Sequence, residues 1–397
     1  MANLSNRLNL FTESQTLMMS KLSRELKNKG IDIINLTLGE PDFTTPEHIK
    51  TAAKEAIEQN FSYYTPVVGY LELREAVCRK LKRENNLHYT PDQIVISTGA
   101  KQSIANAILS IINAGDEVLI PTPYWVSYSE MIKLAEGVPV FIPSSVEGNF
   151  KISATQLEQA ITENTKMLIF SSPCNPTGSV YTKEELASFV NVLEKYPNIW
   201  IISDEIYEHI NYLSKHESIA QFESIKERTI IINGLSKAFA MTGWRLGYMA
   251  SSVALAQACD KIQGQFTSAT SSISQRAAIA ALDGSIKPTE EMREAYKKRR
   301  DLVFELLKDI PGLKTNLPDG AFYFFPDVSS FFGKKHEKGV INSAEDLCMF
   351  LLYDAHVSLV TGAAFGSPTN IRFSYASSEK TLREGMRRIK ESLSKLI

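Results

Sequence analysis

The stretch TIIINGLSKAFAMTGWRLGYMAS, residues 229–251, places two apolar runs on either side of a polar segment. The runs TIIIN and LGYMAS have the β-branched and apolar composition of short strands. Ser236, Lys237 and Arg245 lie between them, and charged side chains are seldom buried without partners. Open α/β sheets bind ligands just beyond the carboxyl ends of their strands. The stretch therefore predicts a strand end that carries a binding site.

Five similar runs precede it, and helical patterns such as 101–115 and 181–196 separate many of them. Strands that are apolar throughout are buried on both faces, which favours a mainly parallel sheet covered by helices. The fold class predicted is therefore α/β. The five runs are QIVIST (93–98), DEVLIP (116–121), VPVFIP (138–143), TKMLIFSS (165–172) and NIWIISDEI (198–206).

The pattern changes from about residue 288 onward. A long helical pattern at 289–310 is followed by strand candidates AFYFFPD and NIRFSYA and by an amphipathic helix at 378–396. We expect these elements to form a smaller α+β domain together with the N-terminal segment. The predicted division is a large domain of residues 46–287 and a discontinuous small domain of residues 1–45 and 288–397.

The composition excludes several classes of function. A net charge of −2 and a pI near 6.4 give no electrostatic basis for binding nucleic acid or membranes. The four cysteines form no CxxC pair, and the six histidines show no metal-ligand spacing, so no metal site is predicted. The N-terminus has no apolar stretch typical of a signal peptide, and we expect a cytoplasmic protein.

Small and acidic residues follow two of the strand candidates. Gly99, Ala100 and Lys101 open a helix, where backbone N–H groups can bind a phosphate, although an ordinary strand–helix turn also needs a glycine. Asp204 at a buried strand end needs a partner, which a protonated pyridine nitrogen would supply. A helix-capping aspartate is the ordinary alternative. Tyr207 lies one helical turn further on and can point the same way.

The remaining candidates are each weak in isolation. Lys237 is suited to condense with an aldehyde if its site lowers its pKa, and Arg245 with Ser236 can hold a phosphate. Asn175 lies in an NPTG turn, Trp125 can stack on a flat ring, and the ordinary alternatives are a plain turn and core packing. Arg372 lies in a strand candidate and can clamp a carboxylate or form a surface ion pair. Together these groups supply a complete site for a phosphorylated aromatic aldehyde.

With these motifs in view, the sequence resembles the class I, fold type I, aminotransferases that depend on pyridoxal 5'-phosphate (PLP). The resemblance is greatest to the bacterial-type aspartate aminotransferases, a subgroup that includes prephenate-accepting members. It runs from about residue 14 to the C-terminal helix. The matching blocks are SKAFAMTGWRLGY, SPCNPTG, SDEIYEH, PTPYWVSY, LTLGEPDF, YYTPVVGY, GAFYFFP and RFSYASSE.

The resemblance implies a role for each candidate in binding the cofactor. Lys237 would form the Schiff base and shuttle protons, while Asp204 would pair with the pyridine nitrogen. The phenolic oxygen would contact Tyr207 and Asn175, and Trp125 would stack on the ring. The groups implied around the phosphate are Gly99, Ala100, Lys101, Ser236 and Arg245. Tyr64 would reach the phosphate of a neighbouring subunit, which implies a homodimer with shared active sites.

The resemblance also implies the substrate contacts. Arg372 would clamp the substrate α-carboxylate, assisted by the Gly39 backbone, Trp125 and Asn175. Lys101 is the position that this subgroup associates with dicarboxylic substrates. The implied reaction is transamination between L-aspartate and 2-oxoglutarate, with prephenate or aromatic substrates as further candidates.

Other enzymes on the same fold share the cofactor residues, so three further activities stay open: a C–S β-lyase, a cyclopropane-forming synthase and an aromatic aminotransferase. Arg372, Lys101 and the N-terminal segment argue against the first two. A PLP-binding transcriptional regulator would carry a DNA-binding domain ahead of the match. We expect none, because the match begins near residue 14.

Overall fold

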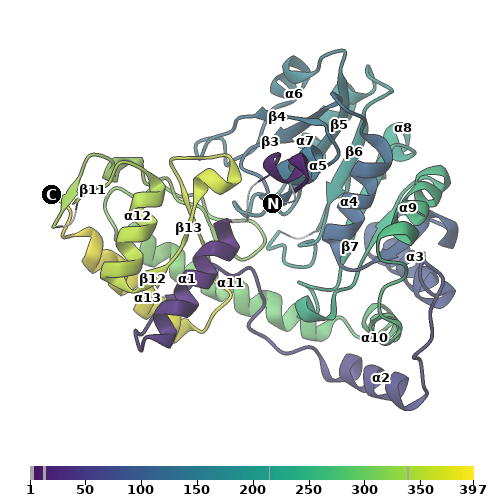
Figure 1. The fold of residues 1–397 in the computed structure, drawn as a ribbon, viewed down its shortest axis with the longest axis horizontal. Helices are drawn as coiled ribbons and strands as arrows, with labels where there is room; N and C mark the ends of the chain where they lie inside the picture. Colours follow the sequence, from purple (N-terminus) through teal and green to yellow (C-terminus); the bar gives the residue numbers. More distant parts are fainter. Residues whose placement is uncertain (1–3, 12–14, 214, 338) are drawn as a thin grey trace.

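The computed structural model describes residues 4–11, 15–213, 215–337 and 339–397. Residue 14, where the family resemblance begins, lies outside this range. Figure 1 shows one group of elements arranged around a large sheet and a second group containing the C-terminus, with α11 extending between them. The N-terminal helix α1 lies in the second group, although most of the chain separates it from its neighbours there.

The large sheet has the strand order β2-β8-β7-β6-β5-β3-β4. Its pairs are parallel except for those made by β8, which is antiparallel to both β2 and β7. All seven apolar runs expected to be strands form this sheet. Its members are β2 (Ile94–Ser97), β3 (Glu117–Pro121), β4 (Val138–Ile142), β5 (Thr165–Ser171), β6 (Trp200–Asp204), β7 (Thr229–Gly234) and β8 (Gly247–Ala250).

One strand departs from the expected burial on both faces. Strand β4 lies at the edge of the sheet, and its Val138 and Phe141 side chains are exposed. An edge strand pairs on one side only, so less of its surface is covered. Strands β6 and β7 lie inside the sheet and are buried almost throughout.

Helices cover both faces of the sheet. Buried residues of α4, α5 and α9 pack against one side, and those of α6 and α7 pack against the other. Helices α2, α3 and α10 enclose a further apolar cluster against β2, β7 and β8. The bounds are α2 (Glu47–Glu58), α3 (Leu71–Asn85), α4 (Ala100–Ile111), α5 (Ser127–Leu134), α6 (Ala154–Ala160), α7 (Lys183–Leu193), α8 (Glu223–Lys226), α9 (Val253–Phe266) and α10 (Ser272–Asp283).

Most of the remaining elements share a separate apolar cluster that joins both ends of the chain. A three-stranded sheet has the order β13-β14-β9, and β1 pairs parallel with β12. The elements are α1 (Gln15–Asn28), β1 (Ile34–Asn35), α11 (Lys287–Lys308), β9 (Tyr323–Phe324), β10 (Lys335–His336), β11 (Gly339–Val340), α12 (Ala344–Phe350), β12 (Val357–Ser358), β13 (Val360–Thr361), β14 (Ile371–Ser374) and α13 (Glu379–Leu393). The exact domain boundaries stay a prediction.

Within the described residues, every helix is too short or too polar to serve as a membrane span. The parallel strands all end at one edge of the large sheet, and the functional residues predicted from the sequence follow several of these ends.

Candidate active site

A cavity of about 360 Å³ lies where the carboxyl ends of the central strands meet residues from both ends of the chain. Apart from Gly99 and Tyr64, every residue predicted to contact cofactor or substrate lines it. They are Gly39, Ala100, Lys101, Trp125, Asn175, Asp204, Tyr207, Ser236, Lys237, Arg245 and Arg372. The fold therefore brings together residues that are more than 300 positions apart in the sequence, such as Gly39 and Arg372.

Lys237 follows β7 and extends into this cavity. Its Nζ atom donates a hydrogen bond to the Gly39 carbonyl oxygen at 2.5 Å. Burial lowers the pKa of the Lys237 amine to about 8, and nearby Arg372 and Arg245 also lower this pKa, whereas Glu40 and Asp204 raise it. A substantial fraction of the amine is therefore neutral near physiological pH, as a nucleophile requires.

Asp204 is the last residue of β6 and is almost fully buried. Its Oδ2 atom accepts a 2.6 Å hydrogen bond from the Tyr128 hydroxyl, and its Oδ1 atom accepts one from the Ile206 backbone N–H. Burial raises the pKa of Asp204 to about 6, although the hydrogen bond from Tyr128 opposes this shift. A cation placed against this carboxylate would lower its pKa again and hold it ionised.

Arg372 lies on β14 and is almost completely buried in the cavity wall. Its Nη1 atom donates to Asn175 Oδ1 at 3.0 Å, and its Nη2 atom donates to the Thr37 carbonyl oxygen at 2.6 Å. The guanidinium carbon lies 4.6 Å from the centre of the Tyr323 ring. Arg372 Nε is buried and has no hydrogen-bond partner among the described residues. The guanidinium thus keeps donors available for an anion.

Tyr207 and Tyr323 form a pair of phenols beside the lysine. Their hydroxyl groups lie 2.7 Å apart, and Lys237 Nζ lies 5.8 Å from the centre of the Tyr207 ring. A Cβ atom at position 39 would collide with the Tyr323 hydroxyl, which explains why a glycine stands there. The Gly39 backbone can therefore approach both Tyr323 and Lys237.

Gly99 precedes α4 and has a φ of 84°, in the region that favours glycine. A Cβ atom there would collide with the Arg245 guanidinium, and one at Gly247 would collide with the backbone of Ala100. The backbone at the start of α4 thus lies directly against Arg245. The first N–H groups of a helix lack intrahelical acceptors and, beside a guanidinium, form a cradle suited to a phosphate.

Lys101 and Trp125 also line the cavity. Lys101 Nζ lies 5.0 Å from the centre of the Trp125 ring, an arrangement typical of a cation–π contact. Desolvation lowers the pKa of Lys101, and the positive charge of Arg245 lowers it further. The Trp125 ring packs edge-on against Tyr128, at 5.4 Å between ring centres.

Tyr64 lies away from this cavity. Its side chain is 97% exposed, and with Tyr63 it lines a shallow cavity whose other wall includes residues 269–272. The structure therefore places Tyr64 on the molecular surface of its own chain. Its predicted contact with the phosphate of a neighbouring subunit stays a prediction.

Sequence reasoning missed several residues of the site. Tyr128 and Tyr323 contact Asp204 and Tyr207 directly, and Thr16, Glu40 and Thr242 also line the cavity. The first two lie inside the matching blocks PTPYWVSY and GAFYFFP. Tyr128 lies only three positions after Trp125, so its closeness in the sequence to a predicted site residue was the available signal.

A family model described as "Aminotransferase class I and II" matches residues 31–389. The chain belongs to the class I and II aminotransferases. An aspartate/prephenate aminotransferase of Cereibacter sphaeroides is 46% identical, with 98% of each chain covered. An aspartate aminotransferase of Pinus pinaster is 47% identical, over 98% of this chain and 81% of the relative.

Solved structures agree with this assignment. The aspartate aminotransferase of Rhizobium meliloti superposes with a TM-score of 0.97 at 40% identity, covering both chains completely. The enzyme from Thermus thermophilus, solved with maleate, gives a TM-score of 0.93 at 38% identity, over 99% of this aminotransferase and 100% of that chain. The fold is therefore the fold type I arrangement of α/β layers.

Aspartate aminotransferases of this family depend on PLP, and the cavity of this aminotransferase fits that cofactor. The backbone N–H groups at the start of α4, beside the Arg245 guanidinium, suit the phosphate. The buried carboxylate of Asp204 suits a protonated ring nitrogen. The amine of Lys237 opens into the same space.

Proposed function

We propose that this aminotransferase transfers an amino group from L-aspartate to 2-oxoglutarate, giving oxaloacetate and L-glutamate. The observation that carries the proposal is one cavity that unites a lysine of lowered pKa, a buried carboxylate and a buried arginine with unused donors. Relatives named as aspartate and aspartate/prephenate aminotransferases support the substrate class. Prephenate and aromatic substrates are further acceptors to test.

Lys237 is the proposed catalytic residue. PLP, when bound, supplies an electron sink for negative charge at the substrate Cα atom. Lys237 would hold the cofactor through its Nζ atom and, once displaced by the substrate amine, would remove the proton from Cα as a general base. The lowered pKa favours the neutral amine that both tasks need.

Asp204 would keep the ring nitrogen protonated, because its buried carboxylate is stabilised by a cationic partner. The hydrogen bond from Tyr128 holds Asp204 in place for this task. Tyr207 and Asn175 would bind the phenolic oxygen of the ring, and Trp125 would pack against its face. Ser236, Arg245 and the backbone from Gly99 to Lys101 would bind the phosphate.

Arg372 would bind the substrate α-carboxylate through the donors left free by Asn175 and Thr37, and the backbone of Gly39 would assist. Lys101 would bind the distal carboxylate of aspartate. Its ammonium lies on the cavity wall without a carboxylate within 4.0 Å among the described residues, so a dicarboxylic substrate would supply its missing counter-charge.

We also propose a homodimer in which Tyr64 completes the phosphate site of the partner subunit. Three aromatic side chains are largely exposed on a single chain: Tyr63 (83%), Tyr64 (97%) and Phe266 (71%). Their exposure supports a partner subunit that covers this surface in solution. The division into domains 46–287 and 1–45 with 288–397 is proposed for each subunit. A cytoplasmic location agrees with the four cysteines, which are all free thiols.

Absorbance and substrate assays test the proposal together. The purified protein should be yellow with PLP bound, and Lys237→Ala should lose the native absorbance band. Aspartate should be consumed only when 2-oxoglutarate or a similar acceptor is present. A colourless protein that ignores added PLP would refute the assignment, and release of ammonia without an acceptor would identify a lyase instead.

A further inference from the structure

A second cavity, of about 450 Å³, lies behind the turn that follows β6. Asp204 and Tyr207 face the active-site cavity, whereas Glu208 and His209 line this second one. One short turn therefore separates the proposed catalytic groups from a cluster of acidic and imidazole side chains. The proposed aminotransferase reaction uses none of these groups.

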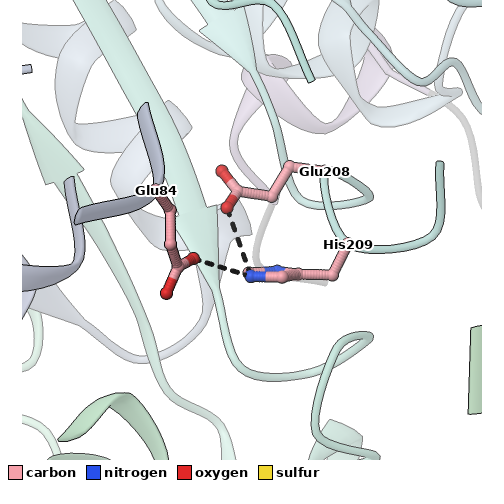
Figure 2. Close-up of side chains that lie close together, drawn as sticks. All are labelled: Glu84, Glu208 and His209. Carbon is pink, nitrogen blue, oxygen red and sulfur yellow. Dashed lines mark hydrogen bonds and ion pairs between the residues drawn. The ribbon is translucent and has the colours of Figure 1, made fainter. Parts of the chain in front are cut away.

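Figure 2 shows one triad in this cluster, formed by Glu84, Glu208 and His209. His209 Nε2 lies 2.9 Å from Glu84 Oε2 and 3.4 Å from Glu208 Oε1. The Lys80 ammonium contacts the same Glu208 oxygen and lies 3.6 Å from Glu84. Lys80, Arg83 and His209 already contact Glu84, so Glu84 and His209 have little need of an external ligand.

A second triad shares Glu208, whose two carboxylate oxygens contact Lys80 and Asn233, and adds Glu205 and His216. One candidate ligand atom from each residue lies within 4.8 Å of the others. The side chains of Glu205, Glu208 and His216 are only 1%, 4% and 8% exposed. They are thus as buried as the apolar core.

The two triads differ in how their polar atoms are satisfied. Glu205 Oε1 accepts hydrogen bonds from the Ser203 and Ser218 hydroxyl groups, but Glu205 Oε2 has no hydrogen-bond partner among the described residues. Both ring nitrogens of His216 are buried and also lack one in that part of the chain. His216 Nε2 lies 3.1 Å from Glu205 Oε2, a distance at which the two groups form an ion pair only when His216 is protonated. Buried polar atoms of this kind are costly when nothing binds them.

The charges point to a cation as the missing partner. Lys80 contacts the carboxylates of Glu208 and Glu84, and Arg83 also contacts Glu84, so two positive charges face the three carboxylates of Glu84, Glu205 and Glu208. The remaining negative charge lies at Glu205, whose Oε2 atom has only His216 within 4.0 Å as a possible cation among the described residues. With His216 neutral, a divalent cation would neutralise this charge, and one imidazole with two carboxylates is a ligand set that suits Zn²⁺.

We propose that Glu205, Glu208 and His216 form a binding site for a divalent transition metal such as Zn²⁺. Glu208 and His216 line the second cavity, which offers an entry path and room for a water molecule as a fourth ligand. The metal would tie the segment around His216 to the turn that carries Asp204 and Tyr207. The site is separate from the proposed reaction, so its failure would leave the aminotransferase assignment intact.

The test uses the intact protein with PLP bound, freed of metals by dialysis against EDTA. Titration calorimetry with ZnCl₂ should show one site per chain, and the melting temperature should rise with zinc concentration. His216→Gln should weaken zinc binding at least about 100-fold, because a direct ligand is lost. His209→Gln is the matched comparison, since its imidazole lies 3.4 Å from Glu208 Oε1 but is not a proposed ligand, so its loss should weaken zinc binding by only about 10-fold.

Glu205→Gln provides a second variant if His216→Gln folds poorly, and it should also abolish the zinc-dependent rise in melting temperature. Absence of zinc binding to the original protein would overturn the proposal and favour a protonated His216 paired with Glu205. Equal affinity in the original protein and His216→Gln would show binding at other histidines, which also overturns it. If His209→Gln loses zinc binding and His216→Gln keeps it, the metal binds at the triad of Glu84, Glu208 and His209, and the proposal is overturned.

Discussion

Two lysines of this aminotransferase are shielded from solvent but contact different groups. Lys80 is 1% exposed and contacts Glu208, and its Nζ atom also donates to Asn85 Oδ1 at 2.9 Å. Lys237 bonds the neutral carbonyl oxygen of Gly39 and has no carboxylate within 4.0 Å among the described residues. Desolvation lowers its pKa to about 8.

The difference shows how one residue type serves two purposes. A buried ammonium that meets a carboxylate keeps its charge and stabilises the fold, because removing either partner leaves the other uncompensated. A buried amine without such a partner loses its proton more readily and becomes a nucleophile. Burial alone therefore does not identify a catalytic lysine, whereas burial without a counter-ion does.

The largest effect is expected from Lys237→Met. It removes the amine that would hold the cofactor and move the Cα proton, so kcat/KM for aspartate should fall by about 10⁴-fold. The measurement is steady-state transfer to 2-oxoglutarate. Lys80→Met, assayed where it stays folded, should retain activity within about 10-fold because it touches neither cofactor nor substrate. If Lys237→Met retains more than about 1% of the activity, Lys237 is not the catalytic lysine and its contrast with Lys80 fails.

A large loss of stability is expected from Lys80→Met. It leaves Glu208 as a buried charge without its ammonium partner, which should cost about 3–5 kcal/mol of unfolding free energy. Urea unfolding in the absence of metal measures this change. The double variant Lys80→Met/Glu208→Gln removes the stranded charge and should recover part of the loss. If the double variant is no more stable than the single one, the Lys80–Glu208 pair is not the cause.

A third lysine sharpens the comparison. Lys101→Ala should lower kcat/KM for aspartate by about 10–100-fold, because a charge-assisted contact to the distal carboxylate is lost. Phenylalanine has no such carboxylate and should be affected less. The ratio of kcat/KM for the two substrates measures the effect. An equal loss with both would assign Lys101 to the phosphate alone.

The smallest effect concerns the stability of the protein without PLP. The pKa of Lys237 is lowered from 10.5 to about 8, so below pH 8 its charge opposes folding, and the opposition disappears as pH rises through 8 toward 10.5. Lys237→Met should therefore stabilise the PLP-free protein at pH 7 by about 1 kcal/mol, a value reduced for the partial exposure of the side chain. Unfolding curves at pH 7 and pH 10 measure it. If the stabilisation by Lys237→Met is larger at pH 10 than at pH 7, the charge of Lys237 is not what opposes folding.

Much of the fold and most of the site could be predicted from the sequence. The apolar runs that became β2 to β8 are local signals, and so is the position of Asp204 and Lys237 directly after two of them. The antiparallel direction of β8 could not be predicted, because strand direction depends on how a connection returns to the sheet. The hydrogen-bond partners of the site residues could not be predicted for a related reason, because residues such as Tyr128 and Asp204 are 76 positions apart in the sequence.

The sequence by itself determined the α/β class and the residue types that surround the cofactor, since composition and periodicity decide which segments become buried strands. Only the tertiary structure decided which lysine contacts a carboxylate and which contacts a neutral carbonyl group, because both Lys80 and Lys237 are ordinary lysines in the linear sequence. It also brought His216 against Glu205 although no metal-ligand spacing links the histidines. Desolvation and pairing depend on atoms that are distant in the sequence, and only the packed chain places them at contact distance.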